Sequence, residues 1–163
     1  MVPKVLLSDE DVALILATPK VIADSGWRGK LLPPKTTLLD LRAKLELGEL
    51  TGPVRGRIHL YSRQNLNPLV TGDWSVGLVF TDYADRTFRV LRCNGPHPSD
   101  HRNTIEGSMI IRTAHIHRLT ERYQSIGRPD GFAEPTDRYS TITAAVEVLA
   151  ELIHLHVDGR LFV

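Results

Sequence analysis

The alternation of apolar and charged residues between positions 39 and 47 is the feature that most constrains the fold. The odd positions are Leu39, Leu41, Ala43, Leu45 and Leu47, and the even ones are Asp40, Arg42, Lys44 and Glu46. Side chains of a strand point alternately to its two faces, so this pattern predicts a strand with one buried face. Such half-buried strands are typical of antiparallel sheets.

Three more strands are predicted downstream. One lies around Arg57–Arg63, and Trp74–Tyr83 with Thr87–Cys93 forms a hairpin around Ala84-Asp85-Arg86. Asn94-Gly95-Pro96 ends this hairpin, because Asn-Gly favours a turn and proline cannot continue a ladder.

The segment Met109–Arg118 is rich in β-branched residues, which favours another strand. The alternative is a helix running to Gln124, with an apolar side formed by Met109, Ile116, Leu119 and Tyr123. A strand is the preferred interpretation. Loops are predicted around Gly26, Gly29 and Pro33-Pro34 and at Gly48–Pro53.

Helices are predicted near both ends of the chain. Ser8 caps the first, because three acidic residues follow it and face the positive end of the helix dipole. Its apolar stripe comprises Val12, Ile15, Leu16 and Pro19. Thr136 or Asp137 can cap the last helix, whose apolar face comprises Ile142, Ala145, Val146, Leu149, Leu152 and Ile153. A short strand at Leu161–Val163 is expected to close the chain.

These elements predict an α+β fold, in which a meandering antiparallel sheet carries an N-terminal and a C-terminal helix. The 163 residues suit one domain, with residues 1–35 as a helix and loop extension, 37–118 as the sheet and 136–157 as the final helix. No segment approaches the length of a membrane span, and no signal peptide is evident, so a cytoplasmic protein of a prokaryote or phage is expected.

The charge balance excludes a strongly basic nucleic-acid-binding protein, because the net charge is only +1. Any nucleic-acid role therefore depends on local charge. Arginines concentrate in one region of the chain: Arg89, Arg92, Arg102, Arg112, Arg118, Arg122 and Arg128. The single cysteine, Cys93, excludes an internal disulfide and is interpreted as a small buried apolar residue.

Four of the seven histidines lie between positions 97 and 117. His115 and His117 project from the same face of the predicted strand, and the loop from Asn94 to Ser108 can bring His97 and His101 beside them. Imidazole has an ordinary pKa of about 6.5, which suits proton transfer, metal binding or anion binding near neutral pH.

Three chemistries fit this cluster. In metal-free RNA cleavage, His115 and His117 are the acid and base, His97 and His101 assist, and arginines hold the phosphate. In metal binding, these four histidines hold zinc or manganese, with Asp100 or Glu106 nearby. In binding without chemistry, the arginines position a phosphate backbone. The expected phosphate-binding residues are Arg92, Asn94, Arg102, Asn103 and Arg118.

Other catalytic signals are weak. His154 and His156 lie where the last helix is expected to end, where histidine is favourable for the helix dipole, and they are assigned no site. The chain has no phosphate-binding GxxxxGK loop, no His-Glu-x-x-His and no Gly-x-Ser-x-Gly.

The order of these motifs resembles a group of small, largely uncharacterised prokaryotic and phage-borne proteins. The shared elements are Arg92-Cys93-Asn94-Gly95-Pro96-His97, His101-Arg102-Asn103 and His115-Ile116-His117, within residues 57–157. More distantly, the chain is similar to the TumE-type toxins, although Cys93 and Asn94 stand where those toxins carry Tyr-Asp. This resemblance implies a toxin-like or phage-conflict role.

The leading hypothesis is therefore a toxin- or defence-type protein that acts on RNA as a metal-independent endoribonuclease. One alternative is a non-catalytic module that binds nucleic acid or protein, such as an antitoxin-like partner or a phage or host factor. The other is a metal enzyme. Acid/base and metal-binding histidines look alike in a sequence, so all three remain open here.

Overall fold

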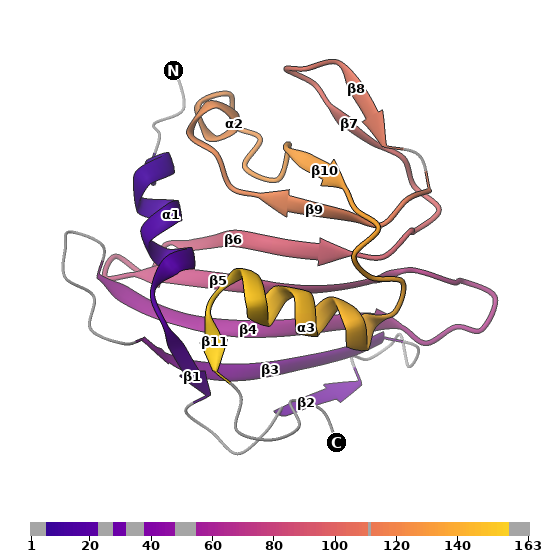
Figure 1. The fold of residues 1–163 in the computed structure, drawn as a ribbon, viewed down its shortest axis with the longest axis horizontal. Helices are drawn as coiled ribbons and strands as arrows, with labels where there is room; N and C mark the ends of the chain where they lie inside the picture. The colour runs from indigo at the N-terminus through magenta and orange to yellow at the C-terminus, as the bar shows by residue number, and fades with distance from the viewer. Residues whose placement is uncertain (1–5, 23–27, 32–37, 48–54, 111, 157–163) are drawn as a thin grey trace.

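The computed structural model describes residues 6–22, 28–31, 38–47, 55–110 and 112–156. It shows an α+β fold with an antiparallel meander, as the sequence predicts (Figure 1). The strands are β1 (Lys20–Ile22), β2 (Arg28–Leu31), β3 (Leu38–Leu47), β4 (Gly56–Asn65), β5 (Trp74–Asp82), β6 (Thr87–Asn94), β7 (His101–Asn103), β8 (Ser108–Ile110), β9 (His115–Arg118), β10 (Ala133–Pro135) and β11 (Leu155–His156). The helices are α1 (Asp9–Ala17), α2 (Glu121–Ser125) and α3 (Ile142–Leu152).

The main sheet has the strand order β10-β9-β6-β5-β4-β3-β1-β11, with β2 also paired to β3. Strands β3, β4, β5 and β6 follow one another as antiparallel neighbours, which confirms the predicted meander and hairpin. β1, which follows α1, and β11, which follows α3, pair in parallel. β7 and β8 form a separate two-stranded sheet.

Helix α1 begins where the sequence predicts. The Asp11 amide donates to Ser8 Oγ at 2.9 Å, and the Ser8 amide donates to the Asp11 carboxylate at 3.4 Å, a reciprocal capping box. The helix ends at Ala17, and Pro19 lies beyond its C-cap. Val12, Ile15 and Leu16 are buried, so this helix packs on the core as expected.

Helix α3 begins later than predicted. Its N-cap is Thr141, whose hydroxyl accepts from the Ala144 amide at 3.2 Å, whereas Thr136 or Asp137 was the expected cap. The earlier residues are not helical because Ala133–Pro135 pairs with β9, and the Thr136 amide donates to the Ala114 carbonyl at 2.9 Å. The sheet therefore holds this segment extended. The predicted apolar face of the helix is otherwise correct, since Ala145, Val146 and Leu149 are buried.

Two further predictions differ from the structure. Met109–Arg118 is not one strand but two, because the chain between β8 and β9 includes Arg112 with a positive φ of 47°. The strand interpretation holds for His115–Arg118, and a helix follows only at α2. Gly29 was expected in a loop, yet Arg28–Leu31 pairs with β3, so backbone pairing outweighs the glycine. The turn at 48–53 and the strand at 161–163 lie outside the described residues.

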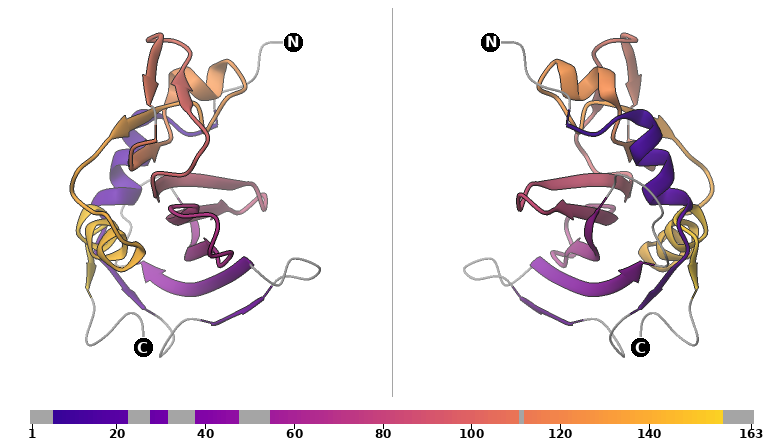
Figure 2. Two further views of the ribbon diagram at one scale, coloured as in Figure 1. Left: turned by 90° about the vertical axis from the view of Figure 1, so that its right-hand side faces the viewer. Right: turned by 90° about the vertical axis from the view of Figure 1, so that its left-hand side faces the viewer.

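Both long helices cover the same face of the sheet (Figure 2). The core between them includes Ile15 of α1 and Leu149 of α3, and the strands contribute Ile58, Leu60, Val76, Leu78, Phe80, Leu91 and Cys93. Within the described residues, no helix combines the length and apolar character needed to cross a membrane.

A buried lysine joins the ends of the two helices. Lys20 Nζ donates to the carbonyls of Ile15 at 2.5 Å, Thr18 at 2.7 Å and Ile153 at 2.7 Å, and Lys20 is 1% exposed. These carbonyls lie at the C-terminal ends of α1 and α3, where the dipoles favour a cation. Burial lowers the pKa of Lys20 to about 8.

Candidate functional site

The polar side of the sheet is set by the register of four strands. Arg92 on β6 pairs with His117 on β9 and Gly77 on β5, and Gly77 pairs with Tyr61 on β4. The next row on the same face is His115, Asn94, Ser75 and Arg63. We call the face that carries these two rows the polar face. It lies opposite the core, because the alternate residues Ile58, Leu60, Val76, Leu78 and Cys93 face the helices.

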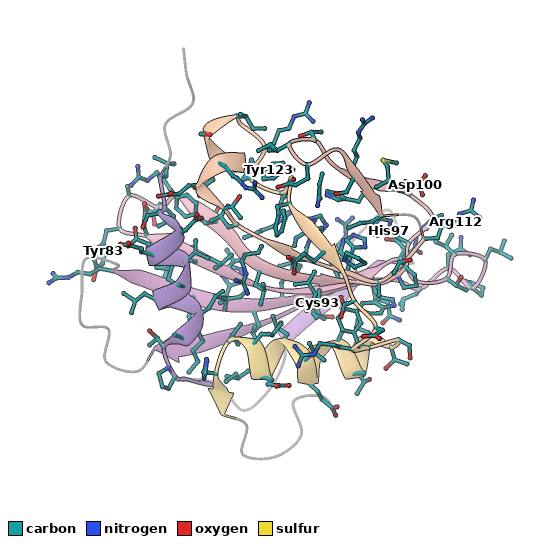
Figure 3. All side chains as sticks on the ribbon, turned by 45° about the horizontal axis from the view of Figure 1, so that its top comes forward. Tyr83, Cys93, His97, Asp100, Arg112 and Tyr123 are labelled. Atoms are coloured by element: carbon teal, nitrogen blue, oxygen red, sulfur yellow. The ribbon has the colours of Figure 1, made fainter. Side chains whose placement is uncertain are left out.

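Four histidines meet beside this face. The loop after β6 and the start of β7 bring His97 and His101 to the strand pair, and the ring centroids of His97 and His115 are 4.9 Å apart. Those of His101 and His117 are 4.7 Å apart, and those of His115 and His117 are 5.0 Å apart. Figure 3 shows His97 and Asp100 at the same end of the molecule, near the β7–β8 hairpin. We call these four residues the histidine cluster.

Backbone carbonyls fix the tautomers of the two strand histidines. His115 Nδ1 lies 2.8 Å from the Thr113 carbonyl, and His117 Nδ1 lies 3.0 Å from the Asp130 carbonyl. A carbonyl oxygen only accepts, so Nδ1 carries the hydrogen in each ring and Nε2 keeps its lone pair. His115 Nε2 is buried and has no partner among the described residues. His115 Nε2 therefore keeps a lone pair that no hydrogen bond uses among the described residues, in a buried position.

His101 is oriented by Asn103. His101 Nε2 donates to Asn103 Oδ1 at 3.0 Å and to the Gly131 carbonyl at 3.0 Å. Asn103 also exchanges two hydrogen bonds with the backbone of Ala133, at 2.8 and 3.0 Å. The Asn103 side chain, which the sequence suggested for phosphate, is thus engaged in linking β7 to β10 and in holding the His101 ring.

The strand histidines are neutral at physiological pH. Burial, followed by the nearby His97, His101 and Arg92 charges, lowers the pKa of His115 to about 4. Burial and the charge of Arg92 lower the pKa of His117 to about 2. They are only 2% and 5% exposed, respectively. Both rings therefore offer a lone pair at pH 7 and carry no extra proton to donate.

Arg92 is the cation nearest to these rings on the polar face. Its Nε is buried without a hydrogen-bond partner, and no ion pair joins it to a carboxylate among the described residues. Asn94 Oδ1 and Tyr61 Oη are likewise buried and unpartnered. Arg92, Asn94 and His97 line a pocket of about 240 Å³ together with Arg63, Asn65, Asp73, Trp74 and Ser75. A half-buried cation whose Nε has no acceptor is suited to an anion.

The other two predicted arginines lie away from the cluster. Arg102 is exposed on β7, next to Met109 of β8. Arg118 alternates with His117 on β9 and so projects to the opposite face, where it lines a different pocket with Ile116 and Glu134. That pocket, of about 730 Å³, is larger but lacks the histidines.

Tyr139 fastens the two strands that carry the site. Its buried hydroxyl lies 3.0 Å from the Asn94 carbonyl and 2.9 Å from the His115 carbonyl. Burial raises the pKa of this hydroxyl, so it remains a donor at all ordinary pH values. Cys93 is fully buried on the side that faces α3, and burial raises the pKa of its thiol to about 12. Cys93 is therefore a packing residue, as the sequence indicated.

Sequence reasoning missed Tyr61, Arg63 and Ser75. Each is an ordinary polar residue of a strand, and only the register of β4, β5 and β6 places them beside Arg92 and Asn94. The signal in the sequence was the period-two alternation of Arg57–Arg63, which assigns Tyr61 and Arg63 to one face but cannot identify their neighbours.

A metal ion has possible ligands in the histidine cluster, since His115 and His117 direct unprotonated Nε2 atoms away from their carbonyl anchors. Within the described part of the chain, however, no group of three or more His, Cys, Asp or Glu side chains has the arrangement of a metal site. Comparison with protein-family models, curated proteins and solved structures returns no match.

Proposed function

We propose that this protein is a metal-independent endoribonuclease whose reaction takes place between Arg92 and the histidine cluster. The observation that carries the proposal is the buried Nε2 of His115, which has no hydrogen-bond partner among the described residues and lies near Arg92, a half-buried arginine with a buried, unpartnered Nε and no carboxylate partner within those residues. Nucleophile activation by a neutral imidazole and stabilisation of phosphate charge by a guanidinium are the two requirements of such a cleavage.

In the proposed reaction, His115 Nε2 takes the proton from a ribose 2′-hydroxyl. The 2′-oxygen forms a bond to the adjacent phosphorus, the bond from phosphorus to the 5′-oxygen breaks, and a 2′,3′-cyclic phosphate results. Arg92 and the amide of Asn94 hold the phosphate oxygens. His97 or His101, both only partly buried, delivers a proton to the departing 5′-oxygen.

In this assignment the general acid is His97 or His101, whereas the sequence pattern predicted that both the acid and the base come from His115 and His117. The low pKa of His117, about 2, leaves it without a proton to donate at pH 7. We assign His117 to orienting its neighbours, because its ring contacts those of His101 and His115. Arg118 takes no part in the proposed reaction, because it lies on the other face.

A toxin or defence role in the cytoplasm, controlled by an antitoxin-like protein, is the biological setting that we propose. Support comes from the resemblance of the Arg92–His97, His101–Asn103 and His115–His117 motifs to phage-borne and toxin-like proteins.

The test is cleavage of a fluorescent single-stranded RNA in excess chelator. His115→Asn is the informative variant, because the Asn amide can replace the Nδ1 donor to Thr113 while removing Nε2. We expect His115→Asn to lower the rate at least about 100-fold and the matched control Arg118→Ala to leave it unchanged. Wild-type products should end in a 2′,3′-cyclic phosphate. Equal rates for wild type and His115→Asn would refute the assignment.

A metal-dependent hydrolase is the second candidate. It is favoured by the hydrogen bonds from Nδ1 of His115 and His117 to carbonyls, the arrangement that usually orients histidine ligands. This candidate predicts that the purified protein contains stoichiometric zinc or manganese and that chelator abolishes cleavage. Elemental analysis and metal re-addition after chelation separate it from the metal-independent enzyme.

A further inference from the structure

The polar face extends along the strands on both sides of the row that holds Arg92 and His117. One end is the 240 Å³ pocket that contains Arg63, which we call the Arg63 pocket. The other is a pocket of about 520 Å³ that contains His59, Val79 and Arg89, which we call the His59 pocket. Arg92 lines the Arg63 pocket and stands one row away from the His59 pocket, because the rows of the sheet run from Val79 and Arg89 through Gly77 and Arg92 to Ser75 and Asn94.

The charges along this path suit a polyanion. Arg63 is exposed, and the Arg89 side chain is 53% exposed and reaches Asp130 only at 3.7 Å, so that pair contributes little. Arg92 has no ion pair within the described ranges. Two carboxylates, those of Asp73 and Asp130, also border the path. Among the described residues that line the two pockets, three guanidinium groups therefore face two carboxylates, one of which is already hydrogen-bonded to Asn65.

An aromatic ring lies at the centre of the path. A Cβ atom at Gly77 would come within 2.6 Å of Tyr61 Cε1, so the absence of a side chain at Gly77 lets the Tyr61 ring lie across β5. Tyr61 is half-buried, and its buried hydroxyl lies near Ser75 of the neighbouring strand. Aromatic rings beside arginines are the usual elements of surfaces on which unpaired bases stack.

We propose that the polar face binds single-stranded RNA, which runs from the His59 pocket past Arg92 to the Arg63 pocket. This inference deepens the proposed function by naming its substrate class. Alternate residues on a strand are about 6.6 Å apart, so successive rows of the face match successive phosphates of an extended chain. Because His115 Nε2 is buried, the reacting nucleotide has to enter the protein surface to meet it, which a flexible single strand allows and the rigid backbone of a duplex does not.

The experiment measures binding without cleavage. A fluorescent 12-nucleotide RNA with 2′-O-methyl groups cannot supply the attacking hydroxyl, and fluorescence anisotropy reports its affinity as a single strand and as a duplex. The variants are Arg63→Ala and Arg89→Ala, neither of which is assigned to the reaction. Arg118→Ala and Arg138→Ala are matched controls, because both residues line the pocket on the opposite face. Circular dichroism verifies that every variant is folded.

We expect the single strand to bind at least about ten times more tightly than the duplex. Arg63→Ala and Arg89→Ala should each weaken binding about threefold to tenfold, and together they should reduce the salt dependence of log K by about 1.4. The controls should leave both quantities unchanged. Equal effects of the control variants, equal affinity for the duplex, or no RNA binding at all would overturn the inference.

The two proposals fail in different ways. Binding that depends on Arg63 and Arg89, with no cleavage of unmodified RNA, would refute the endoribonuclease but keep the binding face. Cleavage that depends on His115, with affinity indifferent to Arg63 and Arg89, would refute the binding path but keep the reaction.

Discussion

Acid should destabilise this protein through His115 and His117 before its carboxylates begin to titrate. Burial lowers the pKa of His115 to about 4 and that of His117 to about 2, whereas each has a pKa near 6.5 in the unfolded chain. Between about pH 6.5 and pH 4, these two histidines therefore bind protons in the unfolded state but not in the folded state. Stability is fully present above about pH 6.5 and falls as the pH is lowered through this window.

The expected magnitude follows from these values. From pH 6 to pH 5, each histidine removes about 1.2 kcal/mol from the free energy of unfolding, and the pair removes about 2.4 kcal/mol. Urea denaturation at pH 6 and pH 5, in chelator, measures this change. His115→Asn with His117→Asn is the informative double variant, because asparagine can keep both hydrogen bonds to the Thr113 and Asp130 carbonyls.

Comparison with the double variant separates these histidines from every other titrating group. The wild type should lose about 2.4 kcal/mol more than the double variant between the two pH values. The groups that face the pair, His97, His101 and Arg92, are present in both proteins. Identical pH dependence of wild type and double variant would show that the two rings titrate with the same pKa in the folded and unfolded states, which would refute the prediction.

Two further predictions concern the supports of the fold. Lys20→Met should lower the free energy of unfolding by about 3 kcal/mol, because it leaves the helix-end carbonyls of Ile15, Thr18 and Ile153 without their shared donor. Urea denaturation measures this loss. A loss below about 1 kcal/mol, which is typical of an exposed ion pair, would contradict the prediction. Tyr139→Phe should cost about 1 kcal/mol in the same assay, since it removes the bridge from β6 to β9, and an unchanged midpoint would argue against that bridge.

The local elements were largely predictable because their causes are local. The Ser8 cap, the alternation in Leu39–Leu47 and the turn at Ala84–Arg86 each depend on a few neighbouring residues, and the structure contains the helix, strand and hairpin that they predict. The start of α3 was not predictable in this way. Thr136 is a good cap, but pairing of Ala133–Pro135 with β9 keeps the chain extended, and that partner is remote in sequence.

The same distinction between local and long-range causes applies to the candidate site. His115 and His117 were placed on one face by strand periodicity, which is local, and Arg92 and Asn94 belong to the paired strand. Whether His97 and His101 would fold back depended on the β7–β8 hairpin and on Asn103, which no local pattern reveals. Arg118 shows that closeness in sequence does not predict membership of the site, because a residue directly after His117 on a strand points to the opposite face.

The most direct test of the central claim is a long-range ¹H–¹⁵N spectrum of the imidazole rings at pH 6.5, with and without a 2′-deoxy dinucleotide that cannot be cleaved. We expect His115 and His117 to carry hydrogen on Nδ1 alone, and we expect the dinucleotide to shift the His115 Nε2 resonance in the wild type but not in Arg92→Ala. Hydrogen on His115 Nε2, or a His115 resonance that does not shift when the dinucleotide is added, would contradict the proposed role of His115.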